Sequence, residues 1–309
     1  MTRPPFPEII DSSMRSDFVA CPRMCELKNI LHWKPKEPNV HLTAGAAYAR
    51  GLEVARRAFY ADHRPPKEAI ALGLGALMEA YGDFECPPDS AKSLDRMLGA
   101  LEYYFHAFPF EADYAHPHTF EGHDGPIIGV EFNFAEPIDV THPVTGQPLI
   151  YTGRLDAVMD FAAGVFPLDD KTTSGIGPKW SQQWDLRSQF TAYVWGVMKA
   201  GIEVSGFMVR GLGILKNRYE KGEAITYRPP WMVERWYKQM CRDVRRMIAC
   251  WEEGYWDYDL SDSCNAYGGC DYRRICLSEH PEPWLETGFE RRKWDPLLRV
   301  ETKLSEGEL

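Results

Sequence analysis

The sequence predicts a mixed α/β fold, in which a central sheet is flanked by helices. Residues 43–107 show the apolar spacing of helices, whereas residues 127–135 alternate in the manner of a strand. Residues 149–161 and 165–170 form two further apolar strands, which are joined by a tight turn at 162–164. A helix, two strands and a last helix follow. Because this order is not a regular series of βαβ units, we expect a mixed sheet.

The individual elements follow from periodicity and from capping and turn residues. Helices are expected at 13–31, 43–60 with Thr43 as its N-cap, 66–81, 90–107, 180–199 with Ser181 near its start, and 230–253. Strands are expected at 127–135, 149–161, 165–170, 204–215 and 224–227. We expect loops at 34–38, 109–126 and 261–278, and a loose polar tail at 281–309.

The composition is that of an ordinary globular protein, since 44% of the 309 residues are hydrophobic and 26% are charged. No apolar stretch is long enough to cross a membrane, and the N-terminus lacks the apolar core of a signal peptide. We therefore expect a cytoplasmic protein with no membrane partner. The net charge of −10 disfavours a protein that coats nucleic acid with a uniformly positive surface. Basic clusters such as Arg245 with Arg246 are either a local groove or solvated helix faces.

An acidic strand pair is the strongest sign of chemistry. If the strands on either side of the turn at 162–164 pair, Asp156 and Asp169 lie close together, and Lys171 shares a face with Asp169 because strand residues alternate. Two carboxylates and an ammonium suit phosphodiester hydrolysis, since hard oxygen ligands hold Mg²⁺ or Mn²⁺ and the lysine orients or deprotonates a water. The carbonyl of Asp170 is a further candidate ligand. The alternative is a solvated hairpin in which the lysine only pairs with an aspartate.

These residues carry a resemblance to a known family. Gly153-x-x-Asp156 followed by Asp169-x-Lys171 resembles motifs II and III of the PD-(D/E)xK nuclease superfamily, and most of all its RecB-type branch, which includes the CRISPR-adaptation exonucleases. That branch has a Gln-x-x-x-Tyr motif on the next helix, which Gln189 and Tyr193 match. The resemblance implies that these two contact the substrate or position the lysine. Their alternative is an ordinary helix surface pair.

A helix motif of the same branch, Gly-x-x-x-His-x-x-x-Glu, is matched in part. Gly45 and Glu53 fit, but Ala49 stands where many relatives have a histidine ligand. The resemblance leaves Glu53 as the one metal ligand from this helix, and the alternative is an ordinary exposed glutamate. Together with Asp156, Asp169 and Asp170 it completes the expected metal-binding set. Glu131, on the strand before motif II, stands where relatives are often acidic, and its role is open.

The eight cysteines point to a second metal site. Cys264, Cys270 and Cys276 are separated by five residues each, in a segment that contains glycines. Four thiolates suit an iron–sulfur cluster or zinc, and these wide spacings favour iron–sulfur over zinc. The resemblance to a subgroup of the branch implies a [4Fe-4S] cluster that Cys21 completes, with Cys25 as a competitor. The alternative is a set of buried thiols, which is how we interpret Cys86, Cys241 and Cys250.

The resemblance implies a restriction-endonuclease-like core. We expect an N-terminal helical segment at 1–40, which supplies one cysteine, and a nuclease core at 41–228 with a helical insertion near 64–108. A C-terminal helix with the Cys-rich loop is expected at 229–280, and a tail at 281–309. It implies a Mg²⁺- or Mn²⁺-dependent deoxyribonuclease, and specifically an exonuclease, that acts on DNA ends or single strands. Recombination, repair, phage DNA metabolism and CRISPR adaptation are the expected settings, with a helicase or recombinase as partner. The alternatives are a nuclease-like fold kept only for binding DNA or protein, and a zinc protein of unrelated enzymology.

Overall fold

The computed structural model describes residues 4–122, 125–259, 262–265, 269–298 and 300–304, which belong to two compact units. Unit 1 combines three stretches of the chain, Met1–Glu37, Phe134–Gly153 and Glu234–Leu309. Unit 2 combines Pro38–Asn133 and Arg154–Val233. Strand β7 (Pro148–Phe161) therefore has its first residues in unit 1 and its last residues in unit 2.

Unit 2 contains a mixed sheet, as the sequence predicts. The second half of β7 pairs antiparallel with β8 (Gly164–Thr173), which pairs parallel with β9 (Phe207–Ile214). Strand β10 (Tyr219–Thr226) is antiparallel to β9, and the short β3 (His116–Pro117) pairs with β7. A separate two-stranded ribbon joins β4 (Thr119–Gly122) to β5 (Gly125–Ile128), and the long β6 (Val130–Thr141) follows.

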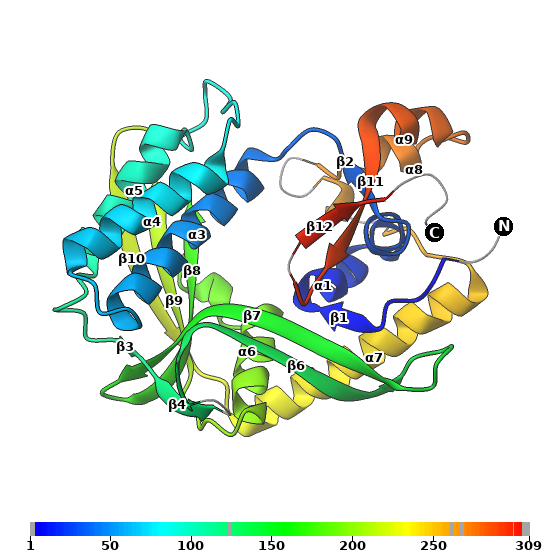
Figure 1. The fold of residues 1–309 in the computed structure, drawn as a ribbon. Helices are drawn as coiled ribbons and strands as arrows, with labels where there is room; N and C mark the ends of the chain where they lie inside the picture. Colours follow the sequence, from blue (N-terminus) through cyan, green and yellow to red (C-terminus); the bar gives the residue numbers. More distant parts are fainter. Residues whose placement is uncertain (1–3, 123–124, 260–261, 266–268, 299, 305–309) are drawn as a thin grey trace. The chain divides into compact units, whose positions relative to one another are not determined.

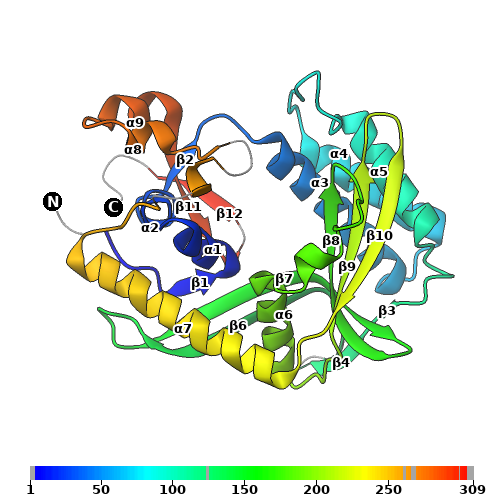
Figure 2. The same cartoon turned by 180° about the vertical axis from the view of Figure 1, so that it is seen from behind.

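Helices cover both faces of this sheet (Figures 1 and 2). Helices α3 (Val40–Tyr60), α4 (Pro66–Tyr81) and α5 (Leu94–Ala107) share one apolar cluster with Leu212 and Ile214 of β9. Helix α6 (Ser188–Lys199) packs on the other face, where Phe190 stacks on Phe207 with ring centres 4.2 Å apart. Leu212 and Ile214 of β9 thus face α3, α4 and α5, whereas Phe207 faces α6, as the alternation of side chains along a strand requires.

The close packing of α3 on α4 depends on two glycines. A Cβ on Gly73 would lie 2.6 Å from the carbonyl oxygen of Gly51, which is closer than real side chains come. Small residues at such a contact let helix backbones approach each other. Helix α3 begins at Asn39, whose side chain accepts hydrogen bonds from the amides of His41 and Leu42.

Unit 1 is built from segments that are distant in sequence. Strand β1 (Ile9–Asp11) pairs parallel with the first half of β7, and strand β11 (Phe289–Asp295) pairs with β2 (Trp33–Pro35) and β12 (Val300–Lys303). The long helix α7 (Pro230–Glu253) is tied to α1 (Ser12–Ala20) by a buried ion pair, in which Arg15 lies 2.7 Å from Asp243. Among the described residues, none of the helices combines the length and apolar character that crossing a bilayer requires.

The expected helix at 13–31 is wrong as a single element. Helix α1 ends at Ala20, Cys21 is extended with φ of −162°, and a short helix α2 (Pro22–Cys25) and a π-helical turn (Glu26–Ile30) follow. The reason is local, because a residue that precedes proline is disfavoured in the α region.

Three other helix starts also differ from the prediction. Helix α3 begins after Asn39 rather than Thr43, and α5 begins at Leu94 rather than at residue 90. Helix α6 begins at Ser188, because the preceding residues form a 3₁₀ turn (Gln182–Trp184) that buries Trp184. Helices α4 and α7, by contrast, have the predicted bounds.

Several expected loops contain short elements. The region 109–126 contains β3 and β4, and the expected tail contains helix α9 (Glu282–Gly288) with strands β11 and β12. The Cys-rich region has a 3₁₀ turn (Asp262–Cys264) and helix α8 (Arg273–Cys276), while its residues 266–268 lie outside the described ones. Such short elements are stabilised by partners distant in the chain, which local periodicity does not show.

Candidate active site

Strands β7 and β8 bring Asp156 and Asp169 together. The two strands pair in register as far as Ala157 opposite Leu168. Gly164 completes the turn between them with φ of +117°, a conformation that glycine adopts readily. If this antiparallel register is continued by one residue on each strand, Asp156 lies opposite Asp169, as the sequence predicts.

At this step, a side-chain oxygen takes the place of a main-chain acceptor in the hydrogen bonding between the two strands. The main-chain amide of Asp170 donates a hydrogen bond of 2.6 Å to Oδ2 of Asp156. Asp169 and Lys171 form an ion pair, which confirms that they share one face of β8. The ammonium of Lys171 lies 5.9 Å from the centre of the Phe190 ring on α6. The carboxylates and the lysine therefore lie where β8 leaves β7, on the side of the sheet that α6 covers.

The electrostatic environment of this group is strongly negative. Burial raises the pKa of Asp156 well above its ordinary value, and the charges of Asp169, Asp170 and Glu131 raise it further. Burial also raises the pKa of Asp169, although the ammonium of Lys171 opposes this effect. Burial lowers the pKa of Lys171, but Asp169 and Asp156 outweigh it, so the net shift is upward. Crowded carboxylates of this kind favour a bound cation.

The donor set fits a hard divalent cation. Among the described residues, Asp156 has no cationic side chain within ion-pair distance, since Lys171 pairs with Asp169. Carboxylate oxygens are the ligands that Mg²⁺ and Mn²⁺ prefer. Within the same described residues, no group of three or more His, Cys, Asp or Glu side chains has an arrangement that could hold a metal ion.

Two of the residues predicted as metal ligands are engaged by arginines. Glu53 forms ion pairs with Arg50 at 2.9 Å and Arg57 at 3.2 Å, both on its own helix α3. The carboxylate of Asp170 points to the opposite side of β8 from its neighbours and lies 2.7 Å from Arg56. A ligand role for either residue remains a prediction.

Gln189 and Tyr193 form the pair that their spacing predicts. Nε2 of Gln189 donates a hydrogen bond of 2.9 Å to the hydroxyl of Tyr193. The Tyr193 ring stacks against Phe207 at 6.1 Å and is only 5% exposed. Phe190, which lies between them in sequence, is the residue of this helix that approaches Lys171.

Sequence reasoning missed three residues around the carboxylates. Arg154 pairs with Glu131 at 2.8 Å, and Glu131 has φ of +55°, a strained value for a residue other than glycine. The sequence could have indicated Arg154, because it stands two residues before Asp156 on the same strand and so shares its face. The sequence could not have indicated Arg56, because its partner Asp170 is far away in the chain. Arg187 is exposed at the N-terminus of α6, and its charge reaches both Asp169 and Lys171.

Unit 1 contains the four predicted cysteines. Burial raises the pKa of Cys276 to about 11; Arg23 lowers it, and the nearby Cys21, Cys270 and Cys264 raise it. The amide of Cys270 donates to the carbonyl of Cys264 at 3.0 Å. Four thiols are the donor set of an iron–sulfur cluster or of zinc.

The competitor Cys25 lies in a different environment. It is fully buried, and its thiol contacts the carbonyl of Met14 and the side chain of Asn29. Burial raises its pKa, and the thiol that influences it is Cys250. Among the cysteines interpreted as core thiols, Cys241 is buried, whereas Cys86 and Cys250 are partly exposed.

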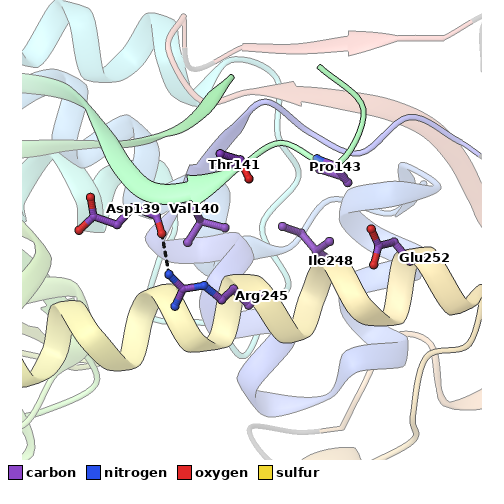
Figure 3. Close-up of a pocket in the computed structure, with 7 residues that line it drawn as sticks. All are labelled: Asp139, Val140, Thr141, Pro143, Arg245, Ile248 and Glu252. Atoms are coloured by element: carbon purple, nitrogen blue, oxygen red, sulfur yellow. Dashed lines mark hydrogen bonds between the residues drawn. The ribbon is translucent and has the colours of Figure 1, made fainter. Parts of the chain in front are cut away.

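A surface pocket of about 430 Å³ lies in unit 1, between β6 and α7 (Figure 3). Its lining residues are Asp139, Val140, Thr141, Pro143, Arg245, Ile248 and Glu252. Arg245 donates a hydrogen bond of 2.6 Å to the carbonyl of Asp139 at its edge. None of the residues predicted for catalysis or for the cysteine site lines this pocket.

No protein-family model matches the chain, and no curated protein matches it. Among solved structures, a proposed exonuclease from Eubacterium rectale is similar, with a TM-score of 0.47, 12% identity, and coverage of 88% of this chain and 93% of that one. The structure of SSO0001 gives a TM-score of 0.30 and 14% identity, over 66% of this chain and 73% of that one. Because both likenesses are weak, we base the function on the site alone.

Proposed function

We propose that the protein is a divalent-metal-dependent DNA nuclease with Asp156, Asp169 and Lys171 at its centre. The observation that carries this proposal is the meeting of two carboxylates and one ammonium at the point where β7 and β8 diverge. Structural ion pairs neutralise charge, but here two carboxylates lie beside a single lysine, which pairs with only one of them. That combination suits phosphodiester hydrolysis.

Each residue has a distinct part in the proposed reaction. Asp156 and Asp169 would hold Mg²⁺ or Mn²⁺, which when bound polarises the phosphoryl oxygen and acidifies a water. Lys171 orients the attacking water and offsets the negative charge that develops on the phosphate. Gln189 and Tyr193 would support the substrate from α6, and the exposed Arg187 is placed to bind a backbone phosphate.

The test is cleavage of labelled linear and circular DNA by the wild-type protein and by Lys171→Met, with Mg²⁺, Mn²⁺ or a chelator. We expect cleavage that requires the metal and that Lys171→Met abolishes. A matched control is Lys92→Met, because Lys92 bonds to Thr172 on the opposite face of β8 at 3.2 Å and should leave cleavage intact. Equal cleavage by the wild type and Lys171→Met contradicts the proposal, and cleavage of the linear form alone identifies an exonuclease.

A second candidate is DNA binding without cleavage. The observation in its favour is that Glu53 is held by two arginines and that Ala49 supplies no ligand beside it. Tight DNA binding by wild-type protein that cleaves no DNA with either metal would support this candidate over the nuclease.

We further propose that Cys21, Cys264, Cys270 and Cys276 hold a [4Fe-4S] cluster, with zinc as the alternative. The support is that Cys21, Cys264 and Cys270 act electrostatically on the thiol of Cys276, whereas the thiol of Cys25 contacts Met14 and Asn29 instead. Iron and zinc are measured in anaerobically purified wild type, Cys276→Ala and Cys25→Ala. We expect iron in the wild type and in Cys25→Ala, and little in Cys276→Ala. Zinc without iron would favour the alternative, and loss of metal in Cys25→Ala alone would exclude this ligand set.

A further inference from the structure

The structure contains a buried polar network directly behind the proposed active site. Asp170 turns its carboxylate away from Asp169 and Lys171, toward Arg56 on helix α3. The two groups are 2.7 Å apart, and their side chains are 3% and 4% exposed. A buried ion pair fixes geometry well, because neither partner finds water as a substitute.

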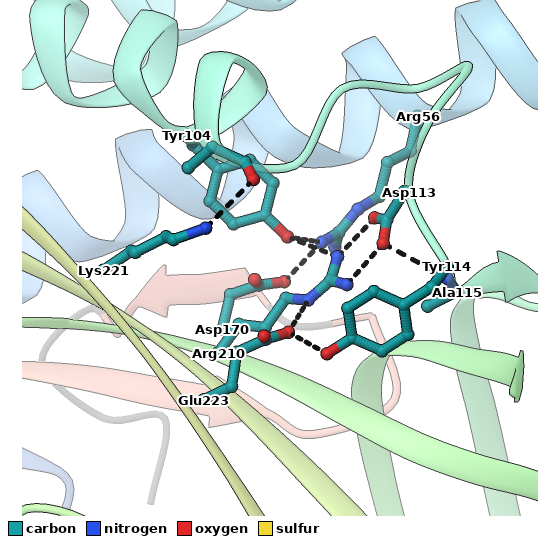
Figure 4. Close-up of polar contacts among 10 residues, drawn as sticks. Arg56, Tyr104, Asp113, Tyr114, Ala115, Asp170, Arg210, Lys221 and Glu223 are labelled. Carbon is teal, nitrogen blue, oxygen red and sulfur yellow. Dashed lines mark hydrogen bonds and ion pairs between the residues drawn. The ribbon is translucent and has the colours of Figure 1, made fainter. Parts of the chain in front are cut away.

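Arg56 is itself held from behind (Figure 4). It donates a hydrogen bond of 2.6 Å to the hydroxyl of Tyr104 on α5. Arg210 on β9 reaches the same hydroxyl at 3.5 Å and is bound by both carboxylate oxygens of Asp113, at 2.6 and 2.7 Å. The guanidinium of Arg56 therefore has little freedom to move, and Asp170 is held against a rigid group.

The same residue, Asp170, acts on the active site through its main chain. Its amide donates the 2.6 Å hydrogen bond to Oδ2 of Asp156. The side chain and the amide nitrogen of one residue share the same Cα, so a carboxylate that is held in place restrains the main chain from which the N–H bond projects. We propose that Arg56 is a positioning residue that, through Asp170, orients the Asp156 carboxylate for a divalent cation; this inference rests on the proposed function.

The network also sets the charge of the site. Arg56 pairs with Asp170, and Arg154 pairs with Glu131, so two of the carboxylates that act on Asp156 each have a cationic partner. A variant that removes only Arg56 would change both charge and geometry. The double variant Arg56→Met/Asp170→Asn removes the ion pair and keeps both the net charge and the amide at position 170.

The experiment compares Mn²⁺ affinity by calorimetry in the wild type and this double variant. We expect about tenfold weaker binding in the double variant. We also expect an upfield shift of the position-170 amide proton in the metal-free protein, because its short hydrogen bond to Asp156 is lost. The matched control is Arg15→Met/Asp243→Asn, which removes a buried ion pair of equal length in unit 1 and should leave Mn²⁺ affinity unchanged.

Tyr104→Phe is the milder second variant, in case the double variant does not fold. It removes the hydroxyl that holds Arg56 and should weaken Mn²⁺ binding about threefold. Wild-type affinity and an unshifted amide proton in the altered proteins would overturn the inference while leaving the proposed function intact. A wild-type protein that neither binds Mn²⁺ nor cleaves DNA would overturn both.

Discussion

The ammonium of Lys171 lies 5.9 Å from the centre of the Phe190 ring, so an aromatic face supports the lysine at the centre of the proposed active site. A cation over an aromatic ring gains about 1 kcal/mol. If the whole of this attraction stabilises the transition state, Phe190→Leu should lower kcat about fivefold. The conversion follows because about 1.36 kcal/mol corresponds to about a tenfold change in rate. Steady-state kinetics on labelled DNA measure this effect.

Phe207→Leu is the control for the Phe190 substitution. It disrupts the same ring stack, whose centres are 4.2 Å apart, but leaves Phe190 beside the lysine. Both variants should lose similar thermal stability, and Phe190→Leu alone should show the fall in kcat. Equal kcat values in the two variants would remove the proposed role of the ring.

Asp156→Asn should stabilise the metal-free protein while it abolishes cleavage. Burial and three neighbouring carboxylates disfavour the ionised form of Asp156, and a neutral amide relieves this repulsion. Its oxygen still accepts the hydrogen bond from the amide of Asp170. We expect a gain on the order of 1 kcal/mol, or about 1–2 °C in Tm for a chain of this size. Thermal melting in a chelator measures it, and a lower Tm would contradict the crowding of negative charge.

Arg187→Gln should weaken DNA binding in a manner that depends on salt. Arg187 is exposed and lies within electrostatic range of Asp169 and Lys171. If it binds one phosphate, its loss should reduce the slope of log K against log salt by about 1. Titrations at several salt concentrations, with a chelator present, measure the slope. Arg64→Gln removes a more remote exposed arginine and should not change the slope.

His32→Asn should make the protein less sensitive to acid. Burial, together with Lys293, Lys34 and Arg291, lowers the pKa of His32 from 6.5 to about 4. The folded state therefore disfavours protonation, and the stability that this confers is full above pH 6.5 and is lost as the pH falls toward 4. Asparagine does not titrate and tolerates the backbone φ of 60° at this position.

The control for this effect is His63→Asn. His63 has a similar φ of 53° but is exposed. Urea unfolding at pH 7, 6, 5 and 4.5 should show a shallower fall in stability for His32→Asn than for the wild type. The His63→Asn curve should run parallel to the wild type. Parallel curves for all three proteins would contradict a buried neutral His32.

The sequence predicted those features that local rules control. Strand alternation alone placed Asp169 and Lys171 on one face of β8, and the structure confirms it. The bounds of α4 and α7 were also predictable, because a proline stands at the first position of each helix and a glycine follows the last.

Features that depend on distant partners were not predictable. Strand β11 forms because residues 33–35 and 300–303 pair with it, and its own sequence is charged and lacks a clear alternation. The pairing of Asp170 with Arg56 joins a strand to a helix far earlier in the chain. A resemblance supplied the role of Glu53, but the ion pairs around it depend on side-chain geometry that a motif does not contain.

The three-part composition of unit 1 has a consequence for biosynthesis. Translation completes every residue of unit 2 before the ribosome begins the stretch that starts at Glu234. Because domains fold as units once their chain has emerged, unit 2 is free to fold first. Cys21 precedes unit 2 in the chain, whereas Cys264, Cys270 and Cys276 follow it. The proposed cluster therefore cannot be completed until all of unit 2 and the chain as far as Cys276 have been synthesised.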